Sequence, residues 1–212
     1  MMASTSRVSS CSSSASHPSL PVRILTRIPV RNNLFRLLLF VAFTAAFADS
    51  RPSEYDVKAA YLLNFGKFVR VEPAASASPH TTFDVCIVGD DPIESALKTL
   101  TNGERVGGLP VRVLHVKDGA QARSCQIAYL SGSEGPRLDQ DLEQLRGADV
   151  LAVSDNATFL TRGGMIQFLL VSNHVRFSVS LDAVRQSHLV LSSEFLRVAY
   201  AVSGMPAKEG TQ

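Results

Sequence analysis

The sequence has 212 residues, of which 45% are hydrophobic and 19% are charged, and its formal net charge is +2 at pH 7. A chain of this size can form one domain with a sizeable buried core. The sequence has no dense cluster of Lys and Arg of the kind that binds nucleic acid, so a nucleic-acid partner is not expected.

The first 48 residues differ in composition from the rest and predict an export signal. They contain nine serines in the first twenty positions and five arginines, and they lack acidic residues. Residues 37–47 are apolar apart from Thr44, and Ala46 and Ala48 stand at the two positions that a signal peptidase reads. We expect a signal peptide at 1–48, cleaved after Ala48, and a single domain at 49–212. A transit peptide, an uncleaved anchor and a start codon placed too early are alternative explanations of the long basic lead.

The first element expected after the signal is a helix that begins next to Ser53. This serine supplies a cap, and Asp56 supplies the acid three residues later. The helix should end before Glu72 and Pro73. Its buried face is predicted from helical spacing to contain Val57, Tyr61, Asn64, Phe65 and Phe68.

Strands and helices then alternate along the chain. Short apolar runs predict strands at 83–88, 111–116, 126–130 and 150–153. After the first strand, Asp91 and Pro92 begin a helix. Its inner face should contain Ile93, Ala96, Leu97 and Leu100. Another helix is marked by Leu138, Leu142 and Leu145.

The C-terminal part predicts a hairpin followed by two helices. Apolar runs at 165–171 and 175–179 flank Ser172-Asn173-His174 and are entered through Gly163-Gly164. Because nearly every position is apolar, we expect both faces of these strands to be covered. A helix is expected at 181–188. A last helix is expected after Ser192. Its inward-facing residues should be Phe195, Leu196, Ala199 and Val202.

This order of elements predicts the α/β class, with a mostly parallel sheet and an antiparallel C-terminal hairpin. Of the three cysteines, Cys11 leaves with the signal, while Cys86 lies in the first strand and Cys125 directly precedes the third. An even pair in an oxidising compartment favours a disulfide, which can form if these two strands are neighbours. Two buried free thiols are the alternative.

The sequence shows no arrangement typical of an active site. Gly89 could hold a phosphate at a helix start, but no nucleotide-binding motif accompanies it. Asp90, Asp91 and Asp155 follow strands, as the acidic cluster of a phospho-acceptor receiver does. Capping is the simpler interpretation, because Asp91 and Asp155 stand where a helix start needs a hydrogen-bond acceptor. The histidines have no metal-ligand spacing, and Ser133 lacks the frame of a hydrolase nucleophile. Neither a metal nor a cofactor is expected.

Arg176 and Arg197 lie in otherwise apolar elements. The simpler interpretation is an outward charge on an amphipathic element, and the alternative is a protein interface, where Arg is enriched. With Phe177, which adjoins Arg176, they are the candidate partner-binding residues.

Seven segments along the chain resemble the YfiR-like family of periplasmic proteins. They are 57–69 (VKAAYLLNFGKFV), 86–92 (CIVGDDP), 125–127 (CQI), 151–155 (LAVSD), 163–168 (GGMIQF), 175–177 (VRF) and 191–196 (LSSEFL). The resemblance implies a three-layer α/β/α sandwich without catalytic residues, and it matches Cys86 and Cys125 to a cysteine pair of the family. A second pair found in some members is absent, and Ser178 and Ser180 replace polar residues common after the Arg-Phe pair.

The resemblance also implies a function and partners. It implies a periplasmic repressor that binds the periplasmic sensor domain of an inner-membrane diguanylate cyclase, lowering cyclic di-GMP and biofilm formation. A peptidoglycan-associated outer-membrane lipoprotein would relieve the repression, and homodimers are implied as well. The alternative is a periplasmic small-ligand-binding module that feeds a sensor kinase or transporter, using the crevice beyond Gly89 and Asp155.

Overall fold

The computed structural model describes residues 52–72 and 80–204. These residues belong to one compact unit, Arg51–Gln212. The expected signal peptide at 1–48 lies outside the described residues.

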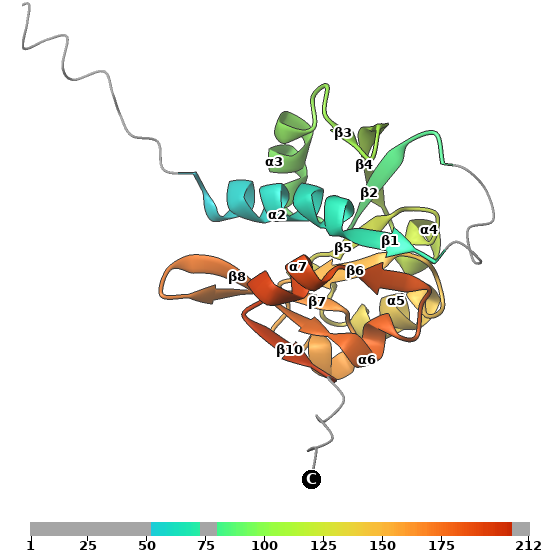
Figure 1. Ribbon diagram of the computed structural model, residues 1–212, viewed down its shortest axis with the longest axis vertical. Helices are drawn as coiled ribbons and strands as arrows, with labels where there is room; N and C mark the ends of the chain where they lie inside the picture. Colours follow the sequence, from blue (N-terminus) through green and yellow to red (C-terminus); the bar gives the residue numbers. More distant parts are fainter. Residues whose placement is uncertain (1–51, 73–79, 205–212) are drawn as a thin grey trace, which may run out of the picture. The chain divides into compact units, whose positions relative to one another are not determined.

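Eight strands form one sheet in the order β10-β8-β7-β6-β5-β2-β4-β3 (Figure 1). The parallel part contains β4 (Leu109–Val116), β2 (Phe83–Val88), β5 (Ile127–Leu130), β6 (Leu151–Ser154) and β7 (Ile166–Val171). β8 (His174–Ser180) runs antiparallel to β7, and β10 (Ala201–Ser203) is parallel to β8. β3 (Arg105–Val106) is an antiparallel edge strand beside β4. The predicted mostly parallel sheet with a C-terminal hairpin is confirmed.

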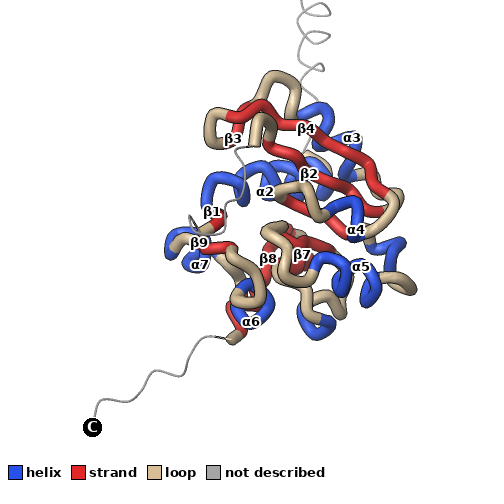
Figure 2. The backbone as a smooth tube through the Cα atoms, turned by 90° about the vertical axis from the view of Figure 1, so that its right-hand side faces the viewer, coloured by secondary structure: helices blue, strands red, loops and turns tan. Residues whose placement is uncertain are grey.

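Helices cover both faces of this sheet. α2 (Glu54–Phe68) lies beside α3 (Ile93–Leu100), and α4 (Gly119–Ala122) lies beside α5 (Leu138–Leu145) (Figure 2). Right-handed crossovers between parallel strands place α3 on one face and α4 and α5 on the other. Every residue of β2, β5 and β6 is buried, as expected of strands between two helical layers. The α/β/α sandwich implied by the resemblance is therefore present.

Helix α2 begins as predicted, but its buried face differs from the expected one. The hydroxyl of Ser53 accepts the amide of Asp56, and the Asp56 carboxylate accepts the amide of Ser53, which completes a capping box. Asn64 and Phe68, expected to be buried, are exposed. The residues buried instead are Lys58, Ala59, Leu62 and Phe65. The helix packs against α3 and α7 (Ser193–Val198) as well as the sheet, so its contact face is wider than a single stripe.

The hairpin β7–β8 is confirmed to within one residue at each predicted strand, but the expected cover on both faces is wrong. Burial alternates along β8, with Val175 and Phe177 buried while Arg176 is exposed. Near the tip, Leu170 is 54% exposed. Figure 1 shows that the tip extends beyond the neighbouring strands, and the first turns of α2 lie near only one face of it. Ser172 and Asn173 both have positive φ, at 48° and 62°, which suits a two-residue hairpin turn.

Several short elements were not predicted, because two to four residues carry no periodic signal. β1 (Val69–Val71) pairs with β9 (Leu189–Leu191) as a separate antiparallel ribbon. The helix expected at 181–188 is shortened to α6 (Leu181–Val184), and the last helix ends at Val198, so that Val202 lies in β10. Leu100, expected on the inner face of α3, is 39% exposed because it ends that helix.

Candidate partner-binding surface around the hairpin

An aromatic cluster fixes the base of the hairpin to α2 and α7. The ring of Phe65 stacks on Phe168 at 5.7 Å between centroids and meets Phe177 and Phe195 edge-on, each at 5.0 Å. Tyr61 meets Phe177 edge-on at 5.6 Å. Such aromatic contacts add to the free energy gained by burial alone. The hairpin therefore rests on a rigid base formed by two strands and two helices.

The structure places the predicted partner-binding residue Phe177 in this cluster. Its side chain is only 2% exposed, so almost none of its ring can touch another protein. Phe177 supports the surface from below and does not form part of it. Phe177 was predicted to bind a partner because it is next to Arg176 in the sequence. Adjacent residues of a strand point to opposite faces, so the exposure of Arg176 implies burial of Phe177.

Beyond the cluster, the hairpin tip and the first turns of α2 enclose an open groove, called here the hairpin groove. It has a volume of about 340 Å³. Its lining residues are Pro52, Glu54, Val57, Tyr61, Leu170, Asn173, His174, Val175 and Arg176. The floor is mainly apolar, and its one acid, Glu54, is paired with Lys58 at 2.6 Å.

Arg176 and Arg197 are exposed and differ from most other arginines in the described part of the chain. Neither forms an ion pair or a side-chain hydrogen bond with any residue in 52–72 or 80–204. Arg112, Arg137 and Arg162 in contrast each pair with a carboxylate. The structure puts Arg176 on β8 beside the hairpin groove and Arg197 on α7. Both guanidinium groups are available to a partner.

Exposed apolar side chains next to the hairpin were missed by the sequence reasoning. Val198 is 66% exposed and Tyr200 is 58% exposed, and neither was among the predicted partner-binding residues. The amide of Tyr200 donates to the carbonyl of Phe177 at 2.8 Å, so Tyr200 lies directly beside β8. Tyr and Arg are both enriched in protein interfaces. The short distance between Arg197 and Tyr200 in the sequence was therefore a signal from which Tyr200 could have been predicted.

The second candidate region, at the carboxyl ends of β2, β5 and β6, is filled by side chains. A Cβ atom at Gly89 would collide with Glu134, whose carboxylate pairs with Arg137. A carboxylate beside Gly89 opposes the anion that was considered for this place. Asp91 does cap α3, accepting the amide of Ile93 at 2.9 Å. The crevice offers no support for a phosphate-bearing ligand.

Asp155 does not cap a helix, contrary to the sequence interpretation. Its carboxylate accepts the ammonium group of Lys58 at 2.7 Å, and Lys58 is only 5% exposed. Burial alone would lower the pKa of Lys58, but its hydrogen bonds to Asp155 and Glu54 outweigh this effect and raise it. Burial, with the charges of Asp155 and Asp91, raises the pKa of Tyr129, so its phenol stays protonated. The ion pair between Lys58 and Asp155 ties α2 to the end of β6.

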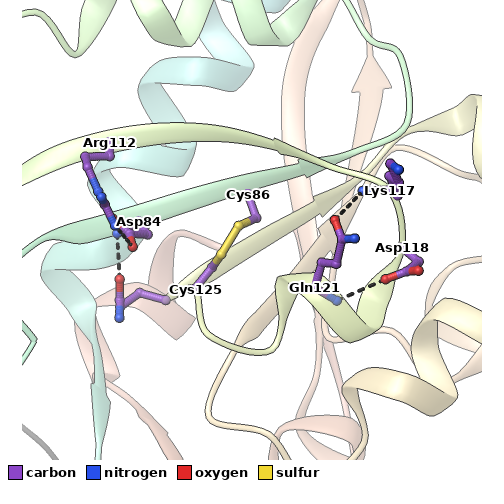
Figure 3. Close-up of a disulfide and its surroundings, with 8 residues drawn as sticks. Asp84, Cys86, Arg112, Lys117, Asp118, Gln121 and Cys125 are labelled. Carbon is purple, nitrogen blue, oxygen red and sulfur yellow. Dashed lines mark hydrogen bonds and ion pairs between the residues drawn. A yellow bond between two sulfur atoms is a disulfide. The ribbon is translucent and has the colours of Figure 1, made fainter.

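A disulfide joins Cys86 of β2 to Cys125, just before β5, with 6.0 Å between their Cα atoms (Figure 3). These strands are neighbours, as the bridge requires. On one side of it, Asp84 pairs with Arg112 at 2.6 Å, and the amide of Asp84 donates to the side chain of Gln126 at 2.6 Å. The disulfide and these bonds fix the start of β5 against β2, away from the hairpin groove.

Two of the described histidines each lie beside a different carboxylate. The ring of His115 lies 2.9 Å from the Glu94 carboxylate, and the ring of His188 lies 2.8 Å from the Asp149 carboxylate. The two pairs share no residue. Within 52–72 and 80–204, no group of three His, Cys, Asp or Glu side chains could hold a metal ion. No helix in the same ranges is both long and apolar enough to span a bilayer.

The aromatic cluster, the disulfide and all but two of the groove residues fall within one region that matches a known family. A model described as YfiR/HmsC-like matches residues 55–200, which is more than half of the chain. The match covers the residues from the first helix to Tyr200 and agrees with the resemblance noted in the seven sequence segments. Proteins of this kind are periplasmic and regulatory, without catalysis. The chain belongs to the YfiR/HmsC-like family.

Proposed function

We propose that this protein is a non-enzymatic periplasmic repressor of an inner-membrane diguanylate cyclase. It binds the periplasmic sensor domain of the cyclase, and so lowers cyclic di-GMP and restrains biofilm formation. Residues 1–48 act as its secretion signal, and 49–212 form the exported domain. A peptidoglycan-associated outer-membrane lipoprotein that sequesters the repressor, and a homodimeric form, belong to the same proposal.

The surface around the hairpin carries this proposal. Unpaired Arg176 and Arg197 and the exposed Val198 and Tyr200 adjoin strands held by the aromatic cluster. A rigid base lowers the ordering cost of binding, and Tyr and Arg are the residue types that dominate binding free energy. Together with the family membership, this favours contact with a protein over turnover of a substrate.

Deletion of the gene tests the proposal. Intracellular cyclic di-GMP should rise in the deletion strain and return to its former level when the full-length gene is restored. Removing, one at a time, each diguanylate cyclase that has a periplasmic sensor domain should identify the partner, because its loss suppresses the rise. An unchanged cyclic di-GMP level in the deletion strain would rule the proposed function out.

A further inference from the structure

The outer edge of β8 is only partly occupied by another strand. β10 pairs with β8 at Ser178–Ser180, and the amide of Tyr200 extends this contact to the carbonyl of Phe177. Among the described residues, no strand lies outside His174–Arg176, whose partners are on β7 alone. Unpaired edges are templates on which another extended chain can add.

Alternation along the strand shows which backbone groups this edge presents. The N–H and C=O groups of a strand residue point to the same side, and successive residues point to opposite sides. The carbonyl of Phe177 points outward, because it accepts the amide of Tyr200. Two residues earlier, Val175 must present its own N–H and C=O outward. A single donor and acceptor are therefore available at the mouth of the hairpin groove.

The side chains beside this edge also alternate in character. Val175 and Leu170 are register partners on the groove side. Arg176, between the outward-pointing backbone positions, has no acidic partner in 52–72 or 80–204. Glu54, the one acid of the groove, is already paired with Lys58. An added strand would thus place apolar side chains over the groove and, on alternate residues, side chains that face the Arg176 cation.

We propose that the partner docks by adding an extended segment to the free edge of β8 at His174–Arg176. The segment carries apolar residues that enter the hairpin groove, alternating with Asp or Glu residues that pair with Arg176. Main-chain hydrogen bonds to Val175 supply affinity, and the groove and the guanidinium group supply specificity. This inference rests on the proposed function, since it specifies how the same partner is held.

Two substitutions test it in the deletion strain. Val175→Pro removes the outward N–H. Because this N–H points away from β7, no hydrogen bond of the hairpin is lost, and proline is tolerated at strand edges. Arg176→Glu replaces attraction of an acidic segment by repulsion. Both variants should leave cyclic di-GMP at the level of the deletion strain. Immunoblots of the periplasmic fraction and melting curves of the purified domains should match those of the wild type.

Arg70→Glu is the matched control. Arg70 lies on β1, is exposed, and has no ion pair with the described residues, but it belongs to the separate β1–β9 ribbon. This variant should lower cyclic di-GMP as the wild type does. The same charge reversal at two unpaired arginines then has opposite outcomes, which assigns the effect to the position and not to the charge of the whole protein.

Each result decides the question. Failure of the wild-type gene to lower cyclic di-GMP would overturn the proposed function and this inference with it. Repression by Arg176→Glu equal to that of the wild type would overturn the inference alone. Loss of repression in Arg176→Glu but not in Val175→Pro would overturn strand addition. If Val175→Pro is not recovered folded, Arg176→Glu still decides. A change of mass of Arg176→Glu in size-exclusion chromatography with light scattering would identify a second copy as the occupant and overturn the choice of partner.

Discussion

Lys58 shows how one side chain can be buried, charged and useful to the fold. Its ammonium group is held by Asp155 from the end of β6 and by Glu54 one turn earlier in α2. Asp155→Asn should lower the free energy of unfolding by about 2 kcal/mol, because the largely buried ammonium group of Lys58 loses a negatively charged partner and keeps only a weaker, neutral acceptor. Asp182→Asn, which breaks the exposed pair with Arg185, should change it by less than about 0.5 kcal/mol. Urea unfolding at pH 7 measures both, and equal effects would contradict this role of Lys58.

Asp84 makes stability depend on pH at acidic values. Hydrogen bonding to Arg112 is the main reason that the pKa of Asp84 lies below its ordinary value of 3.8. Because the pKa is lower in the folded state, this stabilisation is complete above 3.8 and is lost as the pH falls through the folded value. Asp84→Asn should therefore show a smaller decrease in stability than the wild type between about pH 4 and pH 2. Unfolding midpoints across this range provide the test, and identical slopes would disprove it.

At the scale of elements, the disulfide between β2 and the start of β5 closes a loop with a sequence separation of 39. On the chain-entropy account, a loop of this size stabilises the fold by about 4 kcal/mol. Reduction of the wild-type domain should therefore lower the free energy of unfolding by roughly 2–4 kcal/mol. Denaturant unfolding with and without reductant measures the difference. The oxidised domain should also show no titratable thiol under denaturing conditions, and two thiols would contradict the bridge.

The long elements could be predicted from the sequence, whereas the short ones could not. The capping box at Ser53 and the apolar runs of β2, β7 and β8 carry local signals that the structure confirms. β1, β9 and β10 have three residues each, and they form only because the folded chain brings a partner beside them. For the same reason the exposure of Leu170 could not be predicted, since it depends on where α2 begins beside the hairpin.

For the molecule as a whole, the order of elements predicted the layers but not the candidate partner-binding surface. Strand–helix alternation determines an α/β sandwich, and the strands from β5 to β8 lie in the sheet in their order along the chain. The candidate site depends on contacts between distant segments, such as Tyr61 with Phe177 and Tyr200 with the same strand. Sequence reasoning found Arg176 and Arg197 as residues out of place in apolar elements. It could not separate the buried Phe177 from the exposed Tyr200.

The aromatic cluster should couple the stability of the whole domain to the hairpin surface. Phe195 of α7 is 2% exposed and packs on Phe65 and Phe177. Phe195→Ala should lower the free energy of unfolding by about 3–5 kcal/mol through the cavity it leaves. Amide hydrogen exchange should accelerate more in β8 than in β2 and β5, because the disulfide joins those two strands away from the cavity.

Val198→Ala is the control for this prediction, because Val198 lies on the same helix and is 66% exposed. Its stability should stay within about 0.5 kcal/mol of the wild type, with unchanged exchange in β8. If Phe195→Ala destabilised the domain while exchange rose equally in β2, β5 and β8, the cluster would support the fold uniformly. In that case the hairpin would not be held by its own set of contacts. Selective loss of protection in β8 would instead show that α7 and α2 hold the binding edge in place.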